Sequence, residues 1–296
     1  MSSVAVIGCN GQLGADCMRV LAGAKGVDLP EIDIAHRDSC VRKLNELKPV
    51  VLINCAGYTN VEACESDPAC WEANADGPMH LANWARNNDT FLVHISTDYV
   101  FSGDKPLFEG YVETDETSPL SRYGKSKVAG EQAVLESGAR AAVLRTAWMY
   151  GVIGKNFPKS ILRLALQDPE REIRVVCDQF GSPTWSYTLA RQIAAVIDMR
   201  ATGLFHVTSE GFCSWYDLAM SFLSRMNVPH RLVPCTTAEY PTTARRPKNS
   251  ILENARAKSM GLPVFRDWEM DVEAFVQTFR NQLISEAEGA LRESGL

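Results

Sequence analysis

The 296-residue sequence lacks several features that would assign it to a membrane or nucleic-acid-binding class. No apolar stretch approaches the ~20 residues that a membrane-spanning helix requires. The formal net charge is −6, and no run of Lys or Arg forms a basic segment, so we expect no nucleic-acid partner. The chain reaches the apolar run 4–7 without a basic leader or a cleavage site, and no signal peptide is expected. These absences predict a cytoplasmic protein without a membrane partner.

The nine cysteines and five histidines lack the spacing of a structural site. No Cys-x-x-Cys occurs, the cysteine count is odd, and Cys9, Cys17, Cys40 and Cys55 fall within predicted regular elements. This pattern predicts free thiols in a reducing cytoplasm and no disulfide framework. Because the histidines are isolated from one another, we expect no metal site.

The first half of the chain alternates short apolar runs with helical patterns. The apolar runs cover residues 4–7, 50–55, 91–95 and 141–144, and the helical patterns cover 12–22, 69–86 and a segment that starts near Tyr123. Strands that alternate with helices are typical of a parallel sheet covered on both faces. The sequence therefore predicts an α/β fold of the Rossmann type, with a doubly wound parallel sheet.

The second half has a different texture, with Gly and Pro interrupting the pattern after Tyr150. Short strands are expected at 173–177 and 203–207, and helices at 214–226 and from residue 268 onward. We predict a nucleotide-binding domain of residues 1–152 plus about 185–207, and a smaller mixed α/β substrate lobe of about 153–184 and 208–296. The apolar stripe around Phe275 and Phe279 belongs to the core or to an interface, and the core is favoured. A monomer and a homodimer both remain open.

A glycine-rich turn, Gly8-Cys9-Asn10-Gly11-Gln12-Leu13-Gly14, links the first predicted strand to the first helix. Glycines let a backbone turn tightly and approach a pyrophosphate, while a helix N-terminus offers N–H groups and partial positive charge. The spacing differs from the usual Gly-x-Gly-x-x-Gly, but the strand–turn–helix context matches a dinucleotide site. The alternative is a tight structural turn.

Two further segments would line the same crevice. Asp28 lies about 20 residues after the first glycine, where an acidic residue often binds the adenosine ribose. No nearby Arg or Lys is placed to clamp a 2′-phosphate, which favours NADH over NADPH. Asp28 could also be a turn residue, with Asp33 and Ile34 beside the adenine instead. Asn54-Cys55-Ala56-Gly57 ends the third strand with small residues, which would let a cofactor lie across the sheet.

Tyr123 and Lys127 are four residues apart, a spacing that places both side chains on one face of a helix. A neighbouring ammonium would lower the pKa of the phenol and make Tyr123 a proton donor near neutral pH. The strand end Ser96-Thr97-Asp98 would bring a hydroxyl group to the same crevice, where it could orient a substrate carbonyl. The alternatives are a surface Tyr and Lys, and a hydroxyl that caps a loop.

Taken in order, these motifs resemble the extended branch of the short-chain dehydrogenase/reductase superfamily, and within it the dTDP-4-dehydrorhamnose reductase family. The resemblance runs from Val4 to about Asn254. It includes Asn54 to Glu62, Asn74 to Pro78, Ser96 to Phe101, Tyr123 to Lys127, Arg145 to Trp148, Asp178 to Thr184 and Ala244 to Pro247. The ordered set is more specific than any one motif.

The resemblance implies roles for individual residues. Tyr123 would donate the proton, Lys127 would hold the nicotinamide ribose and lower the pKa of Tyr123, and Thr97 would bind the substrate. The implied cofactor-binding residues are Gly8, Asn10, Gly11, Gln12, Leu13, Asp28, Asp33, Ile34, Cys55, Ala56, Gly57, Tyr58, Thr59, Ser96, Tyr123 and Lys127. The implied substrate-binding residues are Thr97, Asp98, Tyr123, Trp148, Asn156, Arg245 and Arg246. For the two arginines, a surface ion pair is the alternative.

The implied reaction is reduction, by NADPH or NADH, of the C4 keto group of a dTDP-linked 4-keto-6-deoxy sugar in surface polysaccharide biosynthesis. A dehydratase of this superfamily has Asp-Glu after the Thr, whereas Asp98 is followed here by Tyr99, so elimination lacks one acid. Two alternatives remain: a reductase of another nucleotide-linked keto sugar, and a non-catalytic subunit like the regulatory subunit of methionine adenosyltransferase.

Overall fold

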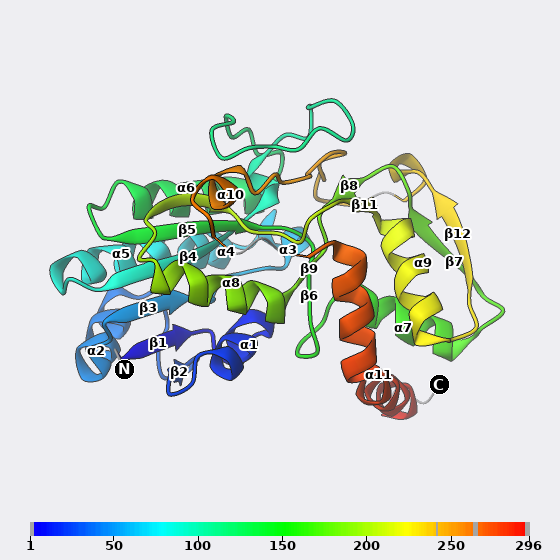
Figure 1. Cartoon of the computed structure of the whole chain (residues 1–296), viewed down its shortest axis with the longest axis horizontal. Helices are drawn as coiled ribbons and strands as arrows, with labels where there is room; N and C mark the ends of the chain where they lie inside the picture. The colour runs from blue at the N-terminus through cyan, green and yellow to red at the C-terminus, as the bar shows by residue number, and fades with distance from the viewer. Residues whose placement is uncertain (1–2, 241, 263–265, 294–296) are drawn as a thin grey trace.

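A computed structural model describes residues 3–240, 242–262 and 266–293 of the chain. Its centre is a six-stranded parallel sheet with the strand order β10-β5-β4-β3-β1-β2 (Figure 1). The strands are β1 (Val4–Ile7), β2 (Lys25–Val27), β3 (Val51–Asn54), β4 (Phe91–Thr97), β5 (Ala141–Thr146) and β10 (Gly203–His206). The chain runs outward from β1 in both directions, so the order reverses between β1 and β3. At such a point the loops after neighbouring strands diverge and leave a crevice.

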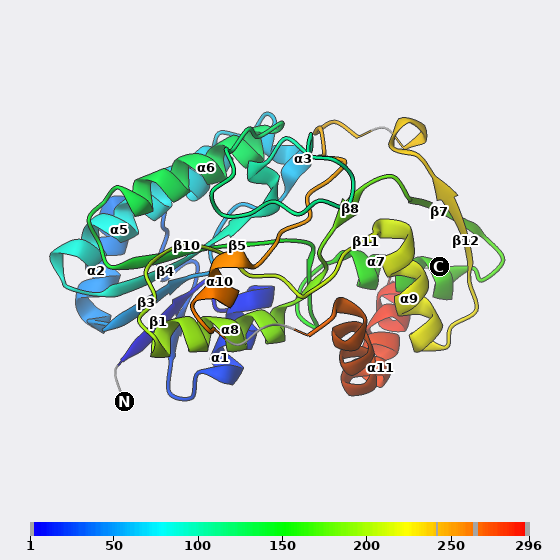
Figure 2. The ribbon, with the colours of Figure 1, turned by 45° about the horizontal axis from the view of Figure 1, so that its top comes forward.

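Helices cover both faces of this sheet, as the alternating pattern predicted. Helices α1 (Gln12–Val20) and α8 (Ser186–Asp198) pack on one face, and α2 (Arg37–Leu47), α5 (Gly77–Asn87) and α6 (Arg122–Leu135) pack on the other (Figure 2). The strands contribute nearly continuous apolar runs because both of their faces are buried. The predicted Rossmann-type fold is confirmed.

A second group of elements packs beside the carboxyl ends of the strands. It contains α7 (Phe157–Gln167), α9 (Trp215–Met226) and α11 (Trp268–Glu293), with the parallel pair β7 (Glu172–Val176) and β12 (Arg231–Cys235). Two short pairs join it to the sheet: β6 (Met149–Tyr150) with β9 (Thr184–Trp185), and β8 (Phe180–Gly181) with β11 (Cys213–Ser214). On α11, Phe275 is fully buried and Phe279 is partly buried against the same cluster, so this stripe is core.

Some element boundaries differ from the sequence prediction. Helix α1 ends at Val20, earlier than predicted. Strand β4 continues through Thr97, because its pairing with β5 extends to Thr146. The helical stretch that begins at Ala69 consists of α4 (Ala69–Trp71), a π-helical turn η1 (Glu72–Asp76) and α5. The remaining short elements are α3 (Val61–Cys64), η2 (Asp98–Val100), η3 (Thr237–Glu239) and α10 (Ala255–Ser259).

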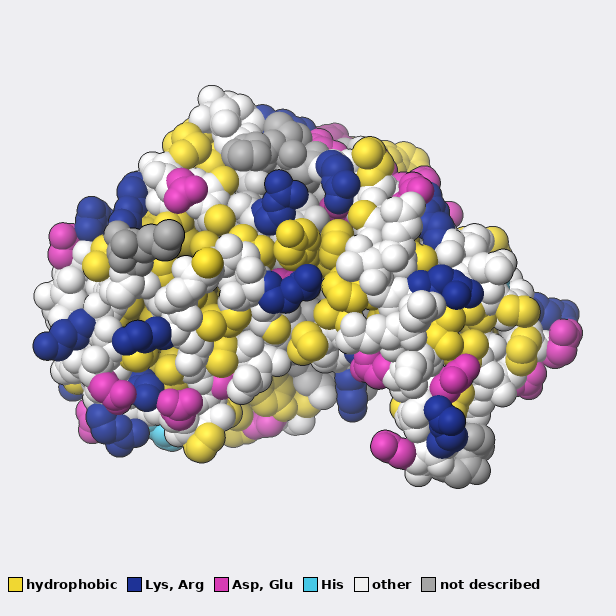
Figure 3. All heavy atoms as spheres, turned by 60° about the horizontal axis from the view of Figure 1, so that its bottom comes forward, with side chains coloured by type: hydrophobic (Ala, Val, Ile, Leu, Met, Phe, Trp, Pro, Cys, Tyr) yellow, Lys and Arg dark blue, Asp and Glu magenta, His cyan; other side chains and the backbone are white. Residues whose placement is uncertain are grey.

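None of the described helices is both long and apolar enough to cross a bilayer. On the face shown in Figure 3, basic and acidic side chains are interspersed among apolar ones.

Candidate active site

A cleft of about 870 Å³ lies over the carboxyl ends of the central strands. It is lined by the turn after β1, the ends of β2 to β5, one face of α6 and the first residue of α9. Of the sequence-predicted residues, the cleft brings together Gly8, Gly11, Gln12, Leu13, Asp28, Asp33, Ile34, Cys55, Ala56, Gly57, Tyr58, Thr59, Ser96, Thr97, Asp98, Tyr123, Lys127 and Trp148. Residues far apart in the sequence therefore meet at one edge of the sheet.

The glycine-rich turn forms a cradle in which side chains at Gly8 and Gly14 would collide with backbone atoms. Gly8 has φ +78°, and a Cβ there would lie 2.8 Å from the backbone nitrogen of Ala56. A Cβ at Gly14 would overlap the carbonyl of Gly8. Gly11 is the N-cap of α1 and provides no side chain to bond the first-turn N–H groups of that helix. The turn thus fits the pyrophosphate of a dinucleotide, which needs close backbone approach and N–H donors.

Acidic and apolar side chains surround the far end of the cleft. Asp28 follows β2 directly, and its carboxylate accepts hydrogen bonds from the backbone N–H groups of Asn10 and Leu29, both at 2.9 Å. Asn10 itself does not line the cleft; its N–H fixes Asp28. Asp33 bonds the N–H of Ala35 at 3.0 Å and also lines this end. The Asp28 carboxylate lines this end of the cleft, and its contact with a ribose hydroxyl stays a prediction.

The side chains of Tyr123 and Lys127 enter the cleft from one face of α6. Both are buried, with 9% and 6% of their surfaces exposed. The Lys127 ammonium donates to the carbonyl of Ile95 at 2.7 Å, which ties α6 to β4. Thr97, at the end of β4, lies beside the Tyr123 phenol in the cleft lining, and its hydroxyl donates to Asp98 Oδ1 at 3.0 Å. A phenol, a hydroxyl and an ammonium thus converge on one region of the cleft.

The expectation that Lys127 lowers the pKa of Tyr123 is wrong for this structure. Burial raises the pKa of the Tyr123 phenol, the negative charge of Asp98 raises it further, and the hydrogen bond with Thr97 only partly opposes them. Lys127 is directed to Ile95, and burial lowers the pKa of its ammonium to about 8. Tyr123 is therefore held in its protonated form, which is the form that a proton donor requires.

Two other ionisable groups near Tyr123 are shifted by burial. Burial raises the pKa of Asp98 to about 6, although hydrogen bonds to its carboxylate oppose the shift. Burial and the charge of Lys127 hold the pKa of His94 well below its ordinary value. Lys127 therefore faces a neutral imidazole from β4.

A buried ion pair lies one helical turn beyond Lys127. Arg145 on β5 donates to Glu131 on α6 through Nε at 2.8 Å and Nη2 at 2.7 Å, and all of these groups are nearly inaccessible to solvent. Ser96 also donates to Glu131, at 2.5 Å. The charge of Glu131 favours the protonated form of Lys127. Glu131 was not predicted, although its spacing of four from Lys127 places it on the same stripe of α6.

Two stacked tryptophans line another part of the cleft wall. The indole rings of Trp148 and Trp215 stack with centroids 3.5 Å apart and an interplanar angle of 5°. Trp148 has φ +44°, and a Cβ at Gly181 would collide with its ring. Gln179 accepts a hydrogen bond from Trp215 Nε1 at 3.2 Å. Trp215 was not predicted, since a Trp at the start of an amphipathic helix carries no sequence signal for a site.

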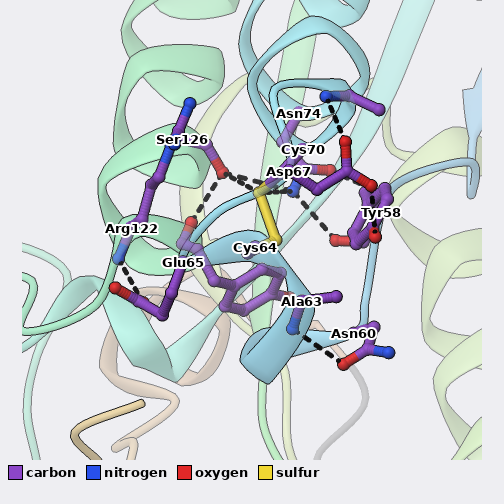
Figure 4. Close-up of a disulfide and its surroundings, with 12 residues drawn as sticks. Tyr58, Asn60, Ala63, Cys64, Glu65, Asp67, Cys70, Asn74, Arg122 and Ser126 are labelled. Carbon is purple, nitrogen blue, oxygen red and sulfur yellow. Dashed lines mark hydrogen bonds between the residues drawn. A yellow bond between two sulfur atoms is a disulfide. The ribbon is translucent and has the colours of Figure 1, made fainter. Parts of the chain in front are cut away.

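The expectation of free thiols throughout is wrong for Cys64 and Cys70, which form a disulfide between α3 and α4 (Figure 4). The seven other cysteines are free. No sequence motif indicates this pair, because the turn between the two short helices brings the sulfurs together. The disulfide packs against Tyr123 in a small buried cluster with Tyr58, Val61 and Tyr99.

Three predicted substrate-binding residues lie outside the cleft lining. Asn156 caps α7 through Lys159 N–H, and its amide donates to Gln12 Oε1 at 2.8 Å. Arg246 forms an ion pair with Glu62 at 2.7 Å, the alternative that the sequence left open. Arg245 is exposed. No group of three or more His, Cys, Asp or Glu side chains is placed to hold a metal among the described residues.

The fold and this cleft define a dinucleotide-dependent oxidoreductase of the short-chain dehydrogenase/reductase type. The RmlD substrate binding domain family model matches residues 1–281. A dTDP-4-dehydrorhamnose reductase of Burkholderia thailandensis is 37% identical, with 94% of this chain and 99% of that protein covered. A dTDP-4-keto-6-deoxy-D-glucose reductase of Streptomyces niveus is 36% identical over 89% of this chain and 92% of its own length.

A solved structure is similar as well. The Bacillus anthracis dTDP-4-dehydrorhamnose reductase in complex with NADP has a TM-score of 0.90 and 35% identity, with 94% of this chain and 99% of that chain covered. The chain belongs to the dTDP-4-dehydrorhamnose reductase family.

Proposed function

We propose that this protein uses NADPH or NADH to reduce the C4 keto group of dTDP-4-dehydro-6-deoxy-L-mannose, giving dTDP-L-rhamnose for surface polysaccharide synthesis. The observation that carries the proposal is the convergence of Tyr123, Thr97 and Lys127 in a cleft whose other end is the glycine-rich cradle. The printed names of the relatives support the same reaction class.

The cofactor would lie from the cradle to Tyr123. Gly8, Gly11 and the N-terminus of α1 would hold its pyrophosphate, and Asp28 would accept a hydrogen bond from its adenosine ribose. Lys127 would hold the nicotinamide ribose. When bound, the reduced nicotinamide supplies the hydride for the reaction. Asp28 favours NADH in this assignment, whereas the B. anthracis relative binds NADP.

The protein's own chemical contribution is one proton and an oriented carbonyl. Thr97 would donate a hydrogen bond to the C4 oxygen, and Tyr123 would transfer its phenolic proton to that oxygen as negative charge develops there. The raised pKa of Tyr123 suits this direction, because an alkoxide is a much stronger base than a phenolate. Tyr99 occupies the place where a dehydratase has Glu, so the acid pair used for elimination lacks one member.

The substrate would occupy the side of the cleft formed by Asp98, Trp148 and Trp215. Asn156, Arg245 and Arg246 are proposed to assist at its margin, where an Arg can bind a diphosphate. The division into a cofactor-binding part, residues 1–152 and about 185–207, and a substrate lobe, about 153–184 and 208–296, belongs to the same proposal. So do a cytoplasmic location and a monomeric or homodimeric state.

The test is a reductase assay with purified protein, enzymatically made dTDP-4-dehydrorhamnose, and NADPH or NADH. We expect the absorbance of the reduced cofactor to fall and dTDP-L-rhamnose to form. No oxidation of either cofactor would refute the proposed reaction. The S. niveus relative makes dTDP-4-keto-6-deoxy-D-glucose the second substrate to assay, and a higher kcat/KM for it would reassign the sugar.

A further inference from the structure

The Cys64–Cys70 disulfide packs behind the cleft wall, against Tyr123, and has no role in the proposed reaction. Both cysteines are fully buried, and they close a loop of residues 64–70 (Figure 4). Where a disulfide occurs in a reducing compartment, it is usually catalytic or redox-sensing. We propose that this pair is a thiol–disulfide modification site that a dithiol reductant opens, and that the disulfide form holds the cleft in its active geometry.

The loop that the disulfide closes is hydrogen-bonded to the cleft and to helix α6. Asp67, inside this loop, accepts a hydrogen bond from the Tyr58 hydroxyl at 2.8 Å. Glu65 accepts one from the backbone N–H of Arg122 at 2.8 Å. Tyr58 lines the cleft, and Arg122 begins α6, one residue before Tyr123. The closed loop therefore holds both a cleft residue and the start of the catalytic helix.

The Cys70 sulfur has polar neighbours. It lies 3.5 Å from Ser126 Oγ and 3.7 Å from Asn74 Nδ2. Asn74 in turn bonds both the N–H and the carbonyl of Tyr58 at 2.9 Å, and Ser126 donates to the carbonyl of Tyr123 at 2.7 Å. Movement of this sulfur would thus displace Asn74 and Ser126, and through them the backbones of Tyr58 and Tyr123.

Cys64 and Cys70 are packed directly against Tyr123. Two thiols cannot occupy the space of two bonded sulfurs, because non-bonded atoms keep a van der Waals separation. The cluster around Cys64 and Cys70 contains the Tyr123 ring, and both cysteines are fully buried within it. Densely packed interiors transmit such a displacement to their neighbours. Reduction would therefore displace the short helices α3 and α4, Tyr123, or both.

Helix α3 carries the displacement to a distant segment of the chain. Glu62, two residues before Cys64, accepts hydrogen bonds from Arg246 at 2.7 Å and from the backbone N–H of Ala244 at 2.8 Å. Arg246 is one of the proposed diphosphate contacts. A loosened α3 would weaken this attachment, so the reduced form would lose substrate positioning as well as proton-donor alignment.

The chemistry is a two-electron exchange. One thiolate of the dithiol attacks one sulfur of the pair, forms a mixed disulfide and releases the other sulfur as a thiolate that takes up a proton. The second thiol of the reductant then displaces the remaining protein sulfur, which is also protonated. The reductant leaves as a disulfide, and Cys64 and Cys70 carry one thiol each. Because both sulfurs are buried, attack requires local opening of α3 and α4, and we expect slow reduction.

The experiment compares the protein purified without reductant with the same protein after dithiothreitol. Alkylation under denaturing conditions and mass spectrometry should count seven thiols before treatment and nine after it. We expect kcat/KM to fall on the order of 10- to 100-fold on reduction, since a displacement of about 1 Å can have that effect. NADPH affinity, measured by fluorescence titration, should fall several-fold.

Variants separate this pair from the other cysteines. The C64S/C70S double variant should behave like the reduced protein and not respond to dithiothreitol. Cys177→Ser, in a remote and partly exposed position, should keep the full response. Equal NADPH affinity and kcat/KM in the two verified thiol states would overturn the inference, and so would nine alkylated thiols in the untreated protein. The activity readout rests on the proposed function; if neither form reduces the sugar, that function fails, while NADPH affinity still decides the inference.

Discussion

Glu131 and Arg145 form a buried bidentate ion pair one helical turn from Lys127, with Arg145 Nη2 2.7 Å and Nε 2.8 Å from the carboxylate. Lys127 and Arg145 are both cationic, and Glu131 is the anion beside them. A carboxylate oxygen of Glu131 also accepts a hydrogen bond from the hydroxyl of Ser96, which precedes Thr97 at the end of β4. The pair therefore fixes the strand end that presents Thr97 and keeps Lys127 charged in a buried site.

Replacing Glu131 by Gln should move the alkaline limb of the kcat/KM profile to lower pH. Burial already lowers the pKa of Lys127 to about 8, and Glu131 opposes this shift. Without the anion the pKa falls further, so Lys127 loses its proton at a lower pH. The measurement is kcat/KM between pH 6 and 9, together with circular dichroism to confirm folding. Ser96→Ala keeps the charge and should leave the limb in place; an unmoved limb in E131Q would contradict the assignment.

Replacing Tyr123 by Phe should lower kcat by on the order of 10²–10⁴, the usual contribution of a positioned proton donor. Phe keeps the packing against Cys64 and Cys70, so NADPH affinity should remain close to that of the wild type. Tyr240→Phe, at an exposed position, serves as the matched control and should retain full activity. A Y123F enzyme with wild-type kcat would show that the proton comes from another group.

Replacing Asp98 by Asn should stabilise the protein above pH 6. The pKa of Asp98 is raised by burial to about 6, against about 3.9 in an unfolded chain. Ionisation therefore disfavours the folded state: the loss of stability is absent below pH ~4 and complete above pH ~6. The linkage amounts to about 2–3 kcal/mol in the free energy of unfolding. In thermal unfolding from pH 4.5 to 8, the difference in stability between D98N and the wild type should grow with pH. A difference that stays constant would refute the raised pKa of Asp98.

Replacing Trp215 by Ala should raise the KM for the nucleotide sugar by up to about 10-fold, the equivalent of the ~0.5–1.5 kcal/mol that an aromatic stack contributes. Removal of this indole frees Trp148, which lines the substrate side of the cleft at a positive φ. Cofactor affinity should change less than the sugar KM, because Trp215 stacks on Trp148, a proposed substrate contact. Trp215→Phe should recover most of the effect. A rise in the Kd for NADPH with no change in sugar KM would place Trp215 at the cofactor instead.

Local patterns in the sequence determined the fold class and one half of the site. The Gly8 turn, the strand ends at Cys55 and Thr97, and the helical spacing of Tyr123 and Lys127 are all readable within a few residues, because strand and helix periodicities are local properties. Only the tertiary structure decided the stack of Trp148 on Trp215, the ion pair of Glu131 with Arg145, and the disulfide of Cys64 with Cys70. These depend on which distant segments pack together. The tertiary structure also decided that the pKa of Tyr123 is raised, since desolvation depends on the packed surroundings and not on the spacing to Lys127.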